Sequence, residues 1–194
     1  MSLFRLDASI MPATSASRAL GDIVESAWAA TTPAPDVHRR DIGTTPIAAD
    51  LWAAAVTGGA TPEAERTELQ RTARTLATTL ADELLAADAL LLTVPLYNYG
   101  VSQHAKTWFD LAYADPRIGP GATGLAGRPA VLVTVLGGSY APGTPKEGWD
   151  HSTGWLERAL RDVWGLDLEV VQRDLTLAHA NPAMAELRPL ADER

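Results

Sequence analysis

Two short segments of the chain, residues 89–94 and 130–136, consist almost entirely of apolar residues. Runs of this kind are typical of β-strands that helices cover on both faces. Residues 3–7, 36–42 and 168–173 also have the length and pattern of strands, although polar residues interrupt them. Prolines precede residues 36–42, which favours a position near the edge of a sheet. The pattern therefore predicts five strands.

Between the predicted strands, apolar side chains recur every three or four residues, the spacing of one face of an α-helix. The clearest such face is formed by Leu69, Ala73, Leu76, Leu80 and Leu84. Thr61 and Pro62 suit the cap and the first position of this helix, which is predicted to reach about residue 87. Further helices are predicted from residue 17 onward and at residues 48–56, 103–114, 152–164 and 182–191.

The alternation of strand and helix predicts the topology. Parallel strands joined by helices require right-handed crossovers, which place helices on both faces of the sheet. With 194 residues and 46% hydrophobic composition, the chain is long enough for one substantial core and too short for two ordinary domains. We therefore expect a three-layer α/β sandwich that makes a single domain of residues 1–194.

Composition narrows the classes of function. The chain contains no cysteine, which excludes thiolate catalysis and disulfides and is compatible with a reducing cytoplasm. The formal net charge of −8 gives no general attraction to nucleic acid or anionic lipid, so neither is an expected partner. No bilayer-spanning apolar run and no signal sequence are recognisable, so we expect a soluble, cytoplasmic protein. The four histidines lack the spacing of metal ligands, and no metal is predicted.

Three loops are the first candidates for a binding site. Ligands of open α/β sheets bind beyond the carboxyl ends of the strands, where the strand order reverses. In this chain the corresponding loops are residues 9–17, 95–102 and 137–143. Because parallel strands end at the same edge of a sheet, these loops are expected to lie close together.

The first of these loops is rich in hydroxyl groups. Ser9, Ser15 and Ser17 lie just before a predicted helix or at its start, where free amide groups and the helix dipole favour an anion such as phosphate. Neither a glycine-rich dinucleotide motif nor a P-loop lysine is present, which leaves Arg18 as the only adjacent cation. The alternative is that Ser15 or Ser17 only caps the helix.

The other two loops offer ring faces and close access to the backbone. Tyr97, Asn98 and Tyr99 follow a buried strand, and their rings and amide suit a flat heterocycle with an imide edge. Gly137 and Gly138 allow positive φ and close approach of a ligand. Taken singly, each segment fits an ordinary turn better, since asparagine and glycine favour turns. Their expected convergence with the hydroxyl-rich loop favours a binding site.

The motif PLYNYGVSQHAKTWFD at residues 95–110 closely resembles the FMN-dependent NADH azoreductases, a family of the flavodoxin-like NAD(P)H:quinone reductase group. The resemblance extends to DASIMPATSASRAL near the N-terminus and to VTVLGG after the fourth strand, in matching order. It implies a flavodoxin-like fold with a five-stranded parallel sheet of strand order 2-1-3-4-5.

The resemblance also assigns the candidate site residues. It implies that the FMN phosphate and ribityl chain are surrounded by Ser9, Ser15, Ala16 (through its backbone amide) and Ser17. The isoalloxazine ring would rest on Pro95, Leu96, Tyr97, Asn98 and Tyr99, with Gly137 and Gly138 at its pyrimidine edge. Lys106, Phe109 and Asp110 match the motif as well, but they lie on the following predicted helix and receive no chemical role.

By the same resemblance, the flavin carries the chemistry and no side chain is catalytic. NADH or NADPH would give a hydride to FMN, and a quinone, azo compound or other planar aromatic acceptor would then take its place in a ping-pong cycle. The family's homodimer is implied too, with a partner subunit covering the flavin. Candidate exposed aromatic positions for such a cover are Trp52, Tyr99, Trp108 and Trp149, although ordinary core or surface packing is the favoured interpretation of any single one.

Two departures from the family pattern concern the substrate pocket. Val135 and Leu136 stand where the family has serine and arginine, and the loop at residues 112–127 is short, with Tyr113 as its only aromatic residue. These changes are compatible with a specialised biosynthetic reductase. Two other interpretations stay open: a flavodoxin-like electron carrier that does not turn over NAD(P)H, and an α/β protein that has lost its cofactor.

Overall fold

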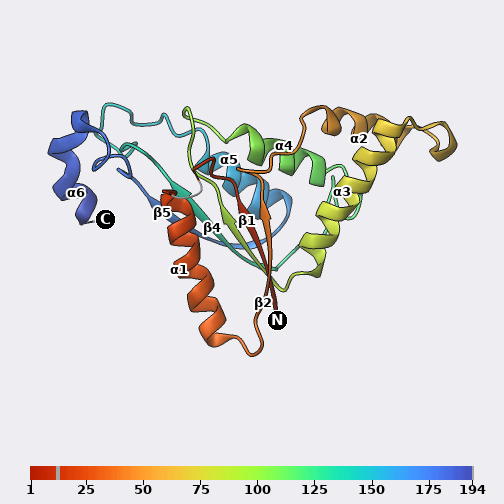
Figure 1. The fold of residues 1–194 in the computed structure, drawn as a ribbon, viewed down its shortest axis with the longest axis horizontal. Helices are drawn as coiled ribbons and strands as arrows, with labels where there is room; N and C mark the ends of the chain where they lie inside the picture. The colour runs from red at the N-terminus through yellow and green to blue at the C-terminus, as the bar shows by residue number, and fades with distance from the viewer. Residues whose placement is uncertain (12–13, 194) are drawn as a thin grey trace.

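The five predicted strands form one parallel sheet in the computed structural model, which describes residues 1–11 and 14–193 (Figure 1). Residues 12 and 13, within the first predicted loop, and residue 194 lie outside the described residues. The strands are β1 (Ser2–Asp7), β2 (Asp36–Asp41), β3 (Ala89–Thr93), β4 (Pro129–Val135) and β5 (Asp167–Arg173). Their order is β2-β1-β3-β4-β5, with every neighbouring pair parallel. The expected sandwich and its strand order are confirmed.

Helices cover both faces of the sheet (Figure 1). On one face, α1 packs on β3 and β4 over a small apolar cluster, and on the other α3, α4 and α5 enclose the main core. The helical segments are α1 (Ala16–Thr31), α2 (Asp50–Ala60), the 3₁₀ turn η1 (Glu63–Glu65), α3 (Glu68–Ala86), α4 (Gln103–Ala112), α5 (Thr153–Glu157), the π-helical η2 (Arg158–Val163), the 3₁₀ helix η3 (Pro182–Leu187) and α6 (Arg188–Asp192).

An aromatic group lies at the centre of the main core. The ring of Trp108, on α4, stacks on Phe4 of β1 at 6.2 Å between centroids and meets Trp164 edge-on at 5.7 Å. Only 2% of Trp108 is exposed, so of the two interpretations of this residue core packing is correct and a place in an exposed aromatic cover is wrong. Trp108 is buried because it lies on the side of α4 that faces the sheet rather than the solvent.

The longest helix begins later than the sequence predicted. Thr67 caps α3 in a reciprocal pair with Gln70: the amide of Gln70 donates to Thr67 Oγ1 at 3.2 Å, and the amide of Thr67 donates to Gln70 Oε1 at 2.9 Å. Such a capping box satisfies two helix-end amides at once. Thr61 instead ends α2, so the predicted start at Thr61 and Pro62 is wrong.

The two C-terminal helices also differ from their predicted form. The helix expected at residues 152–164 begins as α5 and continues as the π-helical η2. The one expected at residues 182–191 is divided into η3 and the short α6. Pro189 lies in the first turn of α6 and has no amide hydrogen to donate, so an unbroken α-helix through this point would lose a hydrogen bond.

Candidate functional site

The hydroxyl-rich loop leads directly into α1. Ser15 caps this helix, because its Oγ accepts a hydrogen bond from the amide of Arg18 at 3.3 Å, and it lies 3.1 Å from the Oγ of Ser17. Of the two serines that the sequence offered as a cap, Ser15 takes this position. The first amides of a helix have no partner within it, so Ala16 and Ser17 supply backbone donors at the same place. This helix start combines hydroxyl and amide donors.

Tyr97, in the loop after β3, is hydrogen bonded to the hydroxyl-rich loop after β1. The hydroxyl of Tyr97 is hydrogen bonded to Ser9 Oγ at 3.2 Å and also accepts the amide of Ile10 at 3.2 Å. Ser9 itself is buried, with 2% of its surface exposed. The two predicted loops are thus joined by side-chain hydrogen bonds.

The segment after Tyr97 is a tight two-residue turn. Gly100 and Tyr97 exchange backbone hydrogen bonds of 3.0 and 3.3 Å, and between them Asn98 and Tyr99 have φ of 49° and 67°. Positive φ is uncommon for a tyrosine, and such strain is found most often at functional sites. The amide of His151 donates to the carbonyl of Tyr99 at 3.0 Å, which helps to hold this conformation.

The paired glycines serve close packing rather than an unusual backbone conformation. Neither Gly137 nor Gly138 uses the positive φ that a glycine allows. A Cβ on Gly137 would lie 2.6 Å from Cδ1 of Leu177, in the loop after β5. The amides of Leu177 and Leu175 donate to the carbonyls of Gly137 and Gly138, each at 3.2 Å. The glycine pair therefore accommodates the loop after β5, which was not among the three predicted loops.

These segments enclose a common cavity of about 190 Å³. Its walls contain seven of the predicted site residues: Ser9, Ser15, Ala16, Pro95, Leu96, Tyr97 and Gly137. The other residues that line it are Met11, Thr14, Val135, Thr176 and Leu177. The convergence of the three loops is thus a feature of the structure. Ser17, Asn98, Tyr99 and Gly138 are not among the residues that line this cavity.

A second cavity adjoins the first at Tyr97, whose side chain forms a ledge between the two cavities. It has a volume of about 540 Å³, shares Tyr97 with the first, and is lined by Asn98 as well as by Ile10 and residues 100–104. The two departures in β4 and its loop lie on the inner side of this ledge, where the carbonyl of Val135 accepts the amide of Leu96 at 2.9 Å. Val135 lines the smaller cavity and Leu136 is fully buried, so the position expected to carry a charge at the rim is an interior one.

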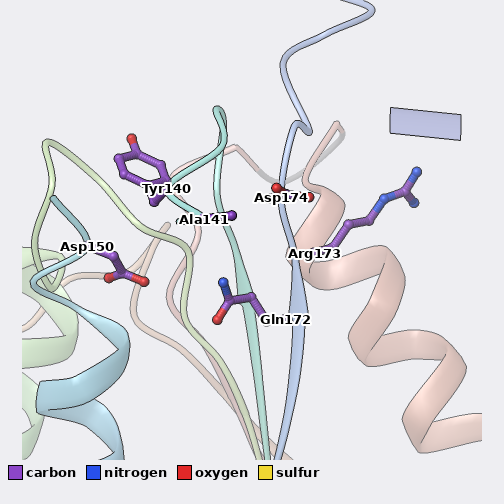
Figure 2. Close-up of a pocket in the computed structure, with 6 residues that line it drawn as sticks. All are labelled: Tyr140, Ala141, Asp150, Gln172, Arg173 and Asp174. Atoms are coloured by element: carbon purple, nitrogen blue, oxygen red, sulfur yellow. The ribbon is translucent and has the colours of Figure 1, made fainter. Parts of the chain in front are cut away.

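On the far side of the loop after β4 lies a more polar cavity of about 410 Å³ (Figure 2). Figure 2 shows the side chain of Arg173 directed away from Gln172 and Asp150. Asp150 lies just before α5, where its carboxylate accepts the amides of Ser152 and Thr153 at 2.9 and 3.0 Å. The residues that line this cavity are Tyr140, Ala141, Asp150, Gln172, Arg173 and Asp174.

Exposed aromatic rings join the Tyr97–Gly100 turn to the loop after β4. The ring of Tyr99 meets Trp149 at 5.4 Å and Tyr140 at 6.3 Å, edge-on in both cases, and Lys146 Nζ lies 5.3 Å from the centre of its ring. Tyr99 is 40% exposed and Trp149 is 48% exposed. The exposure expected for both, and for Trp52 on α2 at 46%, is confirmed.

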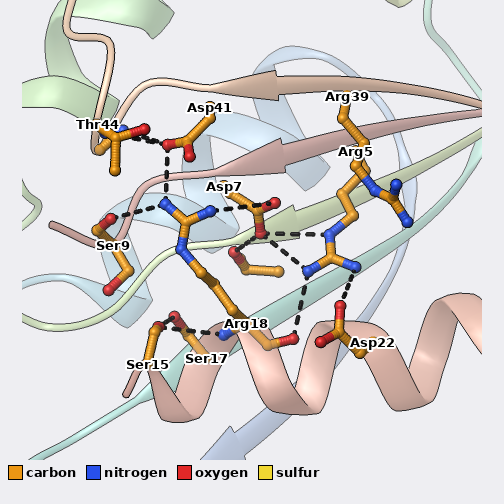
Figure 3. Close-up of polar contacts among 12 residues, drawn as sticks. Arg5, Asp7, Ser9, Ser15, Ser17, Arg18, Asp22, Arg39, Asp41 and Thr44 are labelled. Carbon is orange, nitrogen blue, oxygen red and sulfur yellow. Dashed lines mark hydrogen bonds and ion pairs between the residues drawn. The ribbon is translucent and has the colours of Figure 1, made fainter. Parts of the chain in front are cut away.

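Arg18, expected to be a cation beside the anion site, is engaged elsewhere (Figure 3). Its guanidinium donates to the carboxylate of Asp41 at 2.8 Å and to the carbonyl of Ser9 at 2.9 Å. The ion pair raises the pKa of Arg18 against the opposing effect of its burial. The charge of Arg18 is therefore balanced inside the protein.

Residues 1–11 and 14–193 contain neither a cluster of metal-binding side chains nor a helix that could span a membrane. No group of three or more histidine, aspartate or glutamate side chains is placed to hold a metal ion there. No helix in these same segments is long and apolar enough to cross a membrane.

Comparison with known proteins identifies the family. A family model described as a flavodoxin-like fold matches residues 1–186. The chain therefore belongs to the flavodoxin-like family, in agreement with its strand order and with cavities at the carboxyl edge of its sheet.

Close relatives narrow this class. The FMN-dependent NADH:quinone oxidoreductase of Streptomyces coelicolor is 40% identical over 192 residues, which cover 97% of this chain and 86% of the relative. A protein of the same name from Kineococcus radiotolerans is 40% identical over 193 residues, covering 96% and 89%. The resemblance seen in three short motifs is confirmed over nearly the whole chain.

Solved structures share the fold at low sequence identity. An azoreductase from Bacillus anthracis superposes with a TM-score of 0.75 and 16% identity, over 100% of this chain and 92% of the other. An FMN-dependent NADH-azoreductase from the same species, solved in complex with FMN, has a TM-score of 0.73 and 15% identity, over 100% and 95%.

Proposed function

We propose that this chain is an FMN-dependent oxidoreductase that takes hydride from NADH and delivers it to a quinone, an azo compound or another planar aromatic acceptor. The observation that carries this proposal is the cavity in which the hydroxyl-rich start of α1, the Tyr97 ledge and Gly137 meet. The FMN-dependent NADH:quinone oxidoreductases to which the chain is 40% identical support the same activity.

The donor set of the cavity fits the phosphate and ribityl chain of FMN. Ser9 and Ser15 supply hydroxyls and Ala16 its backbone amide, at a helix start where a negative charge is favoured. Ser17 is fully buried and bonded to Ser15, so it orients the hydroxyl of Ser15. A volume of about 190 Å³ is small for a whole cofactor, since ligand pockets usually exceed about 300 Å³. The ring of FMN would accordingly extend along the adjoining ledge.

The ledge supplies a flat support for that ring. Pro95, Leu96 and Tyr97 line its inner part, and the strained turn presents Asn98 and Tyr99 beyond it. The carbonyls of Gly137 and Gly138 already accept amides from the loop after β5. The backbone groups that remain at this pair are its amides, which we assign as the donors for the pyrimidine edge of FMN. When bound, FMN supplies the capacity to accept a hydride and pass it on.

NADH and the acceptor are proposed to use the open side of the ledge in turn. The exposed rings of Tyr99 and Trp149 and the partly exposed ring of Tyr140 lie beside it and suit planar molecules. The polar cavity of Figure 2 adjoins Tyr140 and offers hydrogen-bonding groups for the polar part of a ligand. Alternating occupation of one place corresponds to a ping-pong cycle.

A homodimer, and a cytoplasmic location where NADH is available, belong to the same proposal. Trp52 and Val56 are exposed on α2 and, with Tyr113, line a cavity of about 300 Å³. Lys106 lies between the rings of Trp52 and Trp155, at 6.0 and 5.6 Å from their centres. Aromatic and apolar residues of this kind are enriched at interface cores.

The decisive experiment uses the purified chain. We expect a yellow protein whose released cofactor is FMN, whose colour is bleached by NADH, and whose colour returns when a quinone is added. Initial-rate plots at several quinone concentrations should run parallel. A yellow protein that is inert to NADH and NADPH would indicate an electron carrier. A colourless protein whose thermal stability does not change with added FMN would indicate loss of the cofactor.

A further inference from the structure

The guanidinium of Arg18 joins three segments of the chain beneath the proposed phosphate site (Figure 3). It donates from Nη2 to the carbonyl of Ser9 at 2.9 Å and to Asp41 Oδ1, at the end of β2, at 2.8 Å. Its Nη1 lies 3.6 Å from Asp7 Oδ2, at the end of β1. Its side chain is 15% exposed, so these contacts are well shielded from solvent.

Asp41 extends this contact into the loop after β2. Its Oδ1 also accepts the amides of Gly43 and Thr44, at 3.1 and 3.0 Å. Gly43 lies so close to the first loop that a Cβ there would be 2.0 Å from the carbonyl oxygen of Ser9. Asp41 and Arg18 together therefore hold the loop after β2 against the backbone of Ser9.

The third contact, Asp7, is itself held rigidly. Its Oδ1 accepts Arg5 Nε and Nη2, each at 3.2 Å, and the hydroxyl of Thr93 in β3 at 2.7 Å. Arg5 is buried and makes further bonds to Asp22 and Glu25 of α1, at 2.6 and 3.0 Å. Arg18 thus faces two carboxylates that are fixed by β1, β2 and β3.

Resting on the proposed binding of FMN, we propose that Arg18 and Asp41 are positioning residues for the phosphate site. Arg18 does not neutralise the phosphate, because its guanidinium is already hydrogen bonded to Asp41 and to Ser9. The guanidinium of Arg18 fixes the carbonyl of Ser9, and the backbone amide of Arg18 donates to Oγ of Ser15. The two serines at opposite ends of the site are held by one residue.

This role and a direct contact with phosphate predict opposite effects of changing Asp41. If Arg18 paired with the phosphate, Asp41 would compete for the guanidinium, and its removal would tighten FMN binding. If Arg18 positions the loop, removal of Asp41 releases the guanidinium and both loops, and FMN binding weakens. A charged hydrogen bond of this kind corresponds to a change of about tenfold in affinity.

The test measures dissociation constants of FMN and riboflavin for the apoprotein by quenching of flavin fluorescence. We expect Asp41→Ala and Arg18→Gln each to weaken FMN binding about tenfold while riboflavin binding changes little. The double variant should be no weaker than the weaker single variant, since both act through one contact. Arg158→Gln, which removes an exposed 2.7 Å pair with Asp162 far from the site, should leave both constants unchanged.

Two milder variants cover the case in which these chains fail to fold. Arg18→Lys and Asp41→Asn keep side-chain size, and we expect each to lower the ratio of FMN to riboflavin affinity, with circular dichroism confirming the fold. Tighter FMN binding by Asp41→Ala or Asp41→Asn, or additive losses in the double variant, would overturn the inference. A wild-type chain that binds no FMN would instead defeat the proposed function, so the two failures are distinguishable.

Discussion

The hydroxyl of Tyr97 lies 3.2 Å from Oγ of Ser9, although the two residues are 88 positions apart in the sequence. One comes from the loop after β3 and the other from the loop after β1, and β1 and β3 are neighbours in the sheet. This hydrogen bond therefore couples the proposed ring ledge to the proposed phosphate site.

Removal of this hydroxyl should weaken FMN binding without abolishing it. Tyr97→Phe keeps the ring but loses the bonds to Ser9 and to the amide of Ile10. We expect about 1 kcal/mol of lost stability in thermal unfolding and about fivefold weaker FMN binding. Tyr99→Phe, at an exposed position of the same turn, is the matched control. Equal FMN affinity of the Tyr97 variant and wild type would contradict the coupling.

The two adjacent glycines should respond differently to a methyl group. In Gly137→Ala the new Cβ meets Leu177 at 2.6 Å, whereas a Cβ on Gly138 meets nothing within 4 Å. Because the side chain of Leu177 is exposed and can move, we expect a cost of about 1 kcal/mol for Gly137→Ala, or about 2–4 °C in Tm. Gly138→Ala should melt like wild type. Adding Leu177→Ala should restore the Tm of the Gly137 variant; no recovery would show that Leu177 is not the obstacle.

The capping box of α3 should be measurable by itself. Thr67→Ala removes the oxygen that accepts the amide of Gln70, and we expect a loss of about 1 kcal/mol in urea unfolding. Thr75→Ala, on the exposed side of the same helix, controls for helix propensity. A loss as large in the control would mean that the cap contributes nothing.

The lowered pKa of Asp41 predicts how the stability of the folded protein changes at acidic pH. Burial alone would raise this pKa, but hydrogen bonds from Arg18 and Thr44 outweigh burial and lower the pKa of Asp41 from 3.8 to about 2. A carboxyl with a lowered pKa stabilises the folded state above its unfolded pKa, and this contribution is lost as pH falls toward the folded value. Since the side chain is 34% exposed, solvent screening reduces the expected contribution to about 1 kcal/mol, lost between about pH 4 and about pH 2.

Urea unfolding of wild type and Asp41→Asn at several pH values checks this expectation. The difference in free energy of unfolding between the two proteins should be largest near neutral pH and should shrink as the pH approaches 2. A difference that stays constant over this range would show that Asp41 does not titrate as its contacts with Arg18 and Thr44 require.

The sequence predicted most of the elements because their signals are local. The apolar runs of β3 and β4 and the helical spacing of α3 are visible within windows of a few residues. The start of α3 was misplaced because Thr61 and Thr67 both suit a helix cap. Packing of α2 against α3 decided between them: a Cβ on Gly58 would lie only 3.1 Å from Gln70, so α2 extends to residue 60.

For the site, the rule that ligands bind at the carboxyl ends of parallel strands selected three loops, and these do line one cavity. The same rule did not single out Leu177, because nothing in its own segment marks the loop after β5 as one that folds back over Gly137. The sequence left Trp108 open between an exposed cover and the core for a related reason: an aromatic side chain suits either side of a helix until the position of that helix is known.

What the sequence determined by itself, then, are the α/β order and the buried strands, since apolar spacing within a short stretch specifies them. The direction of Arg18 was decided only by the tertiary structure. Its partner Asp41 lies 23 residues away, at the end of β2, whereas Arg18 itself is on α1. Only the parallel register of β1 and β2, which sets Asp7 beside Asp41, brings two carboxylates within reach of one guanidinium.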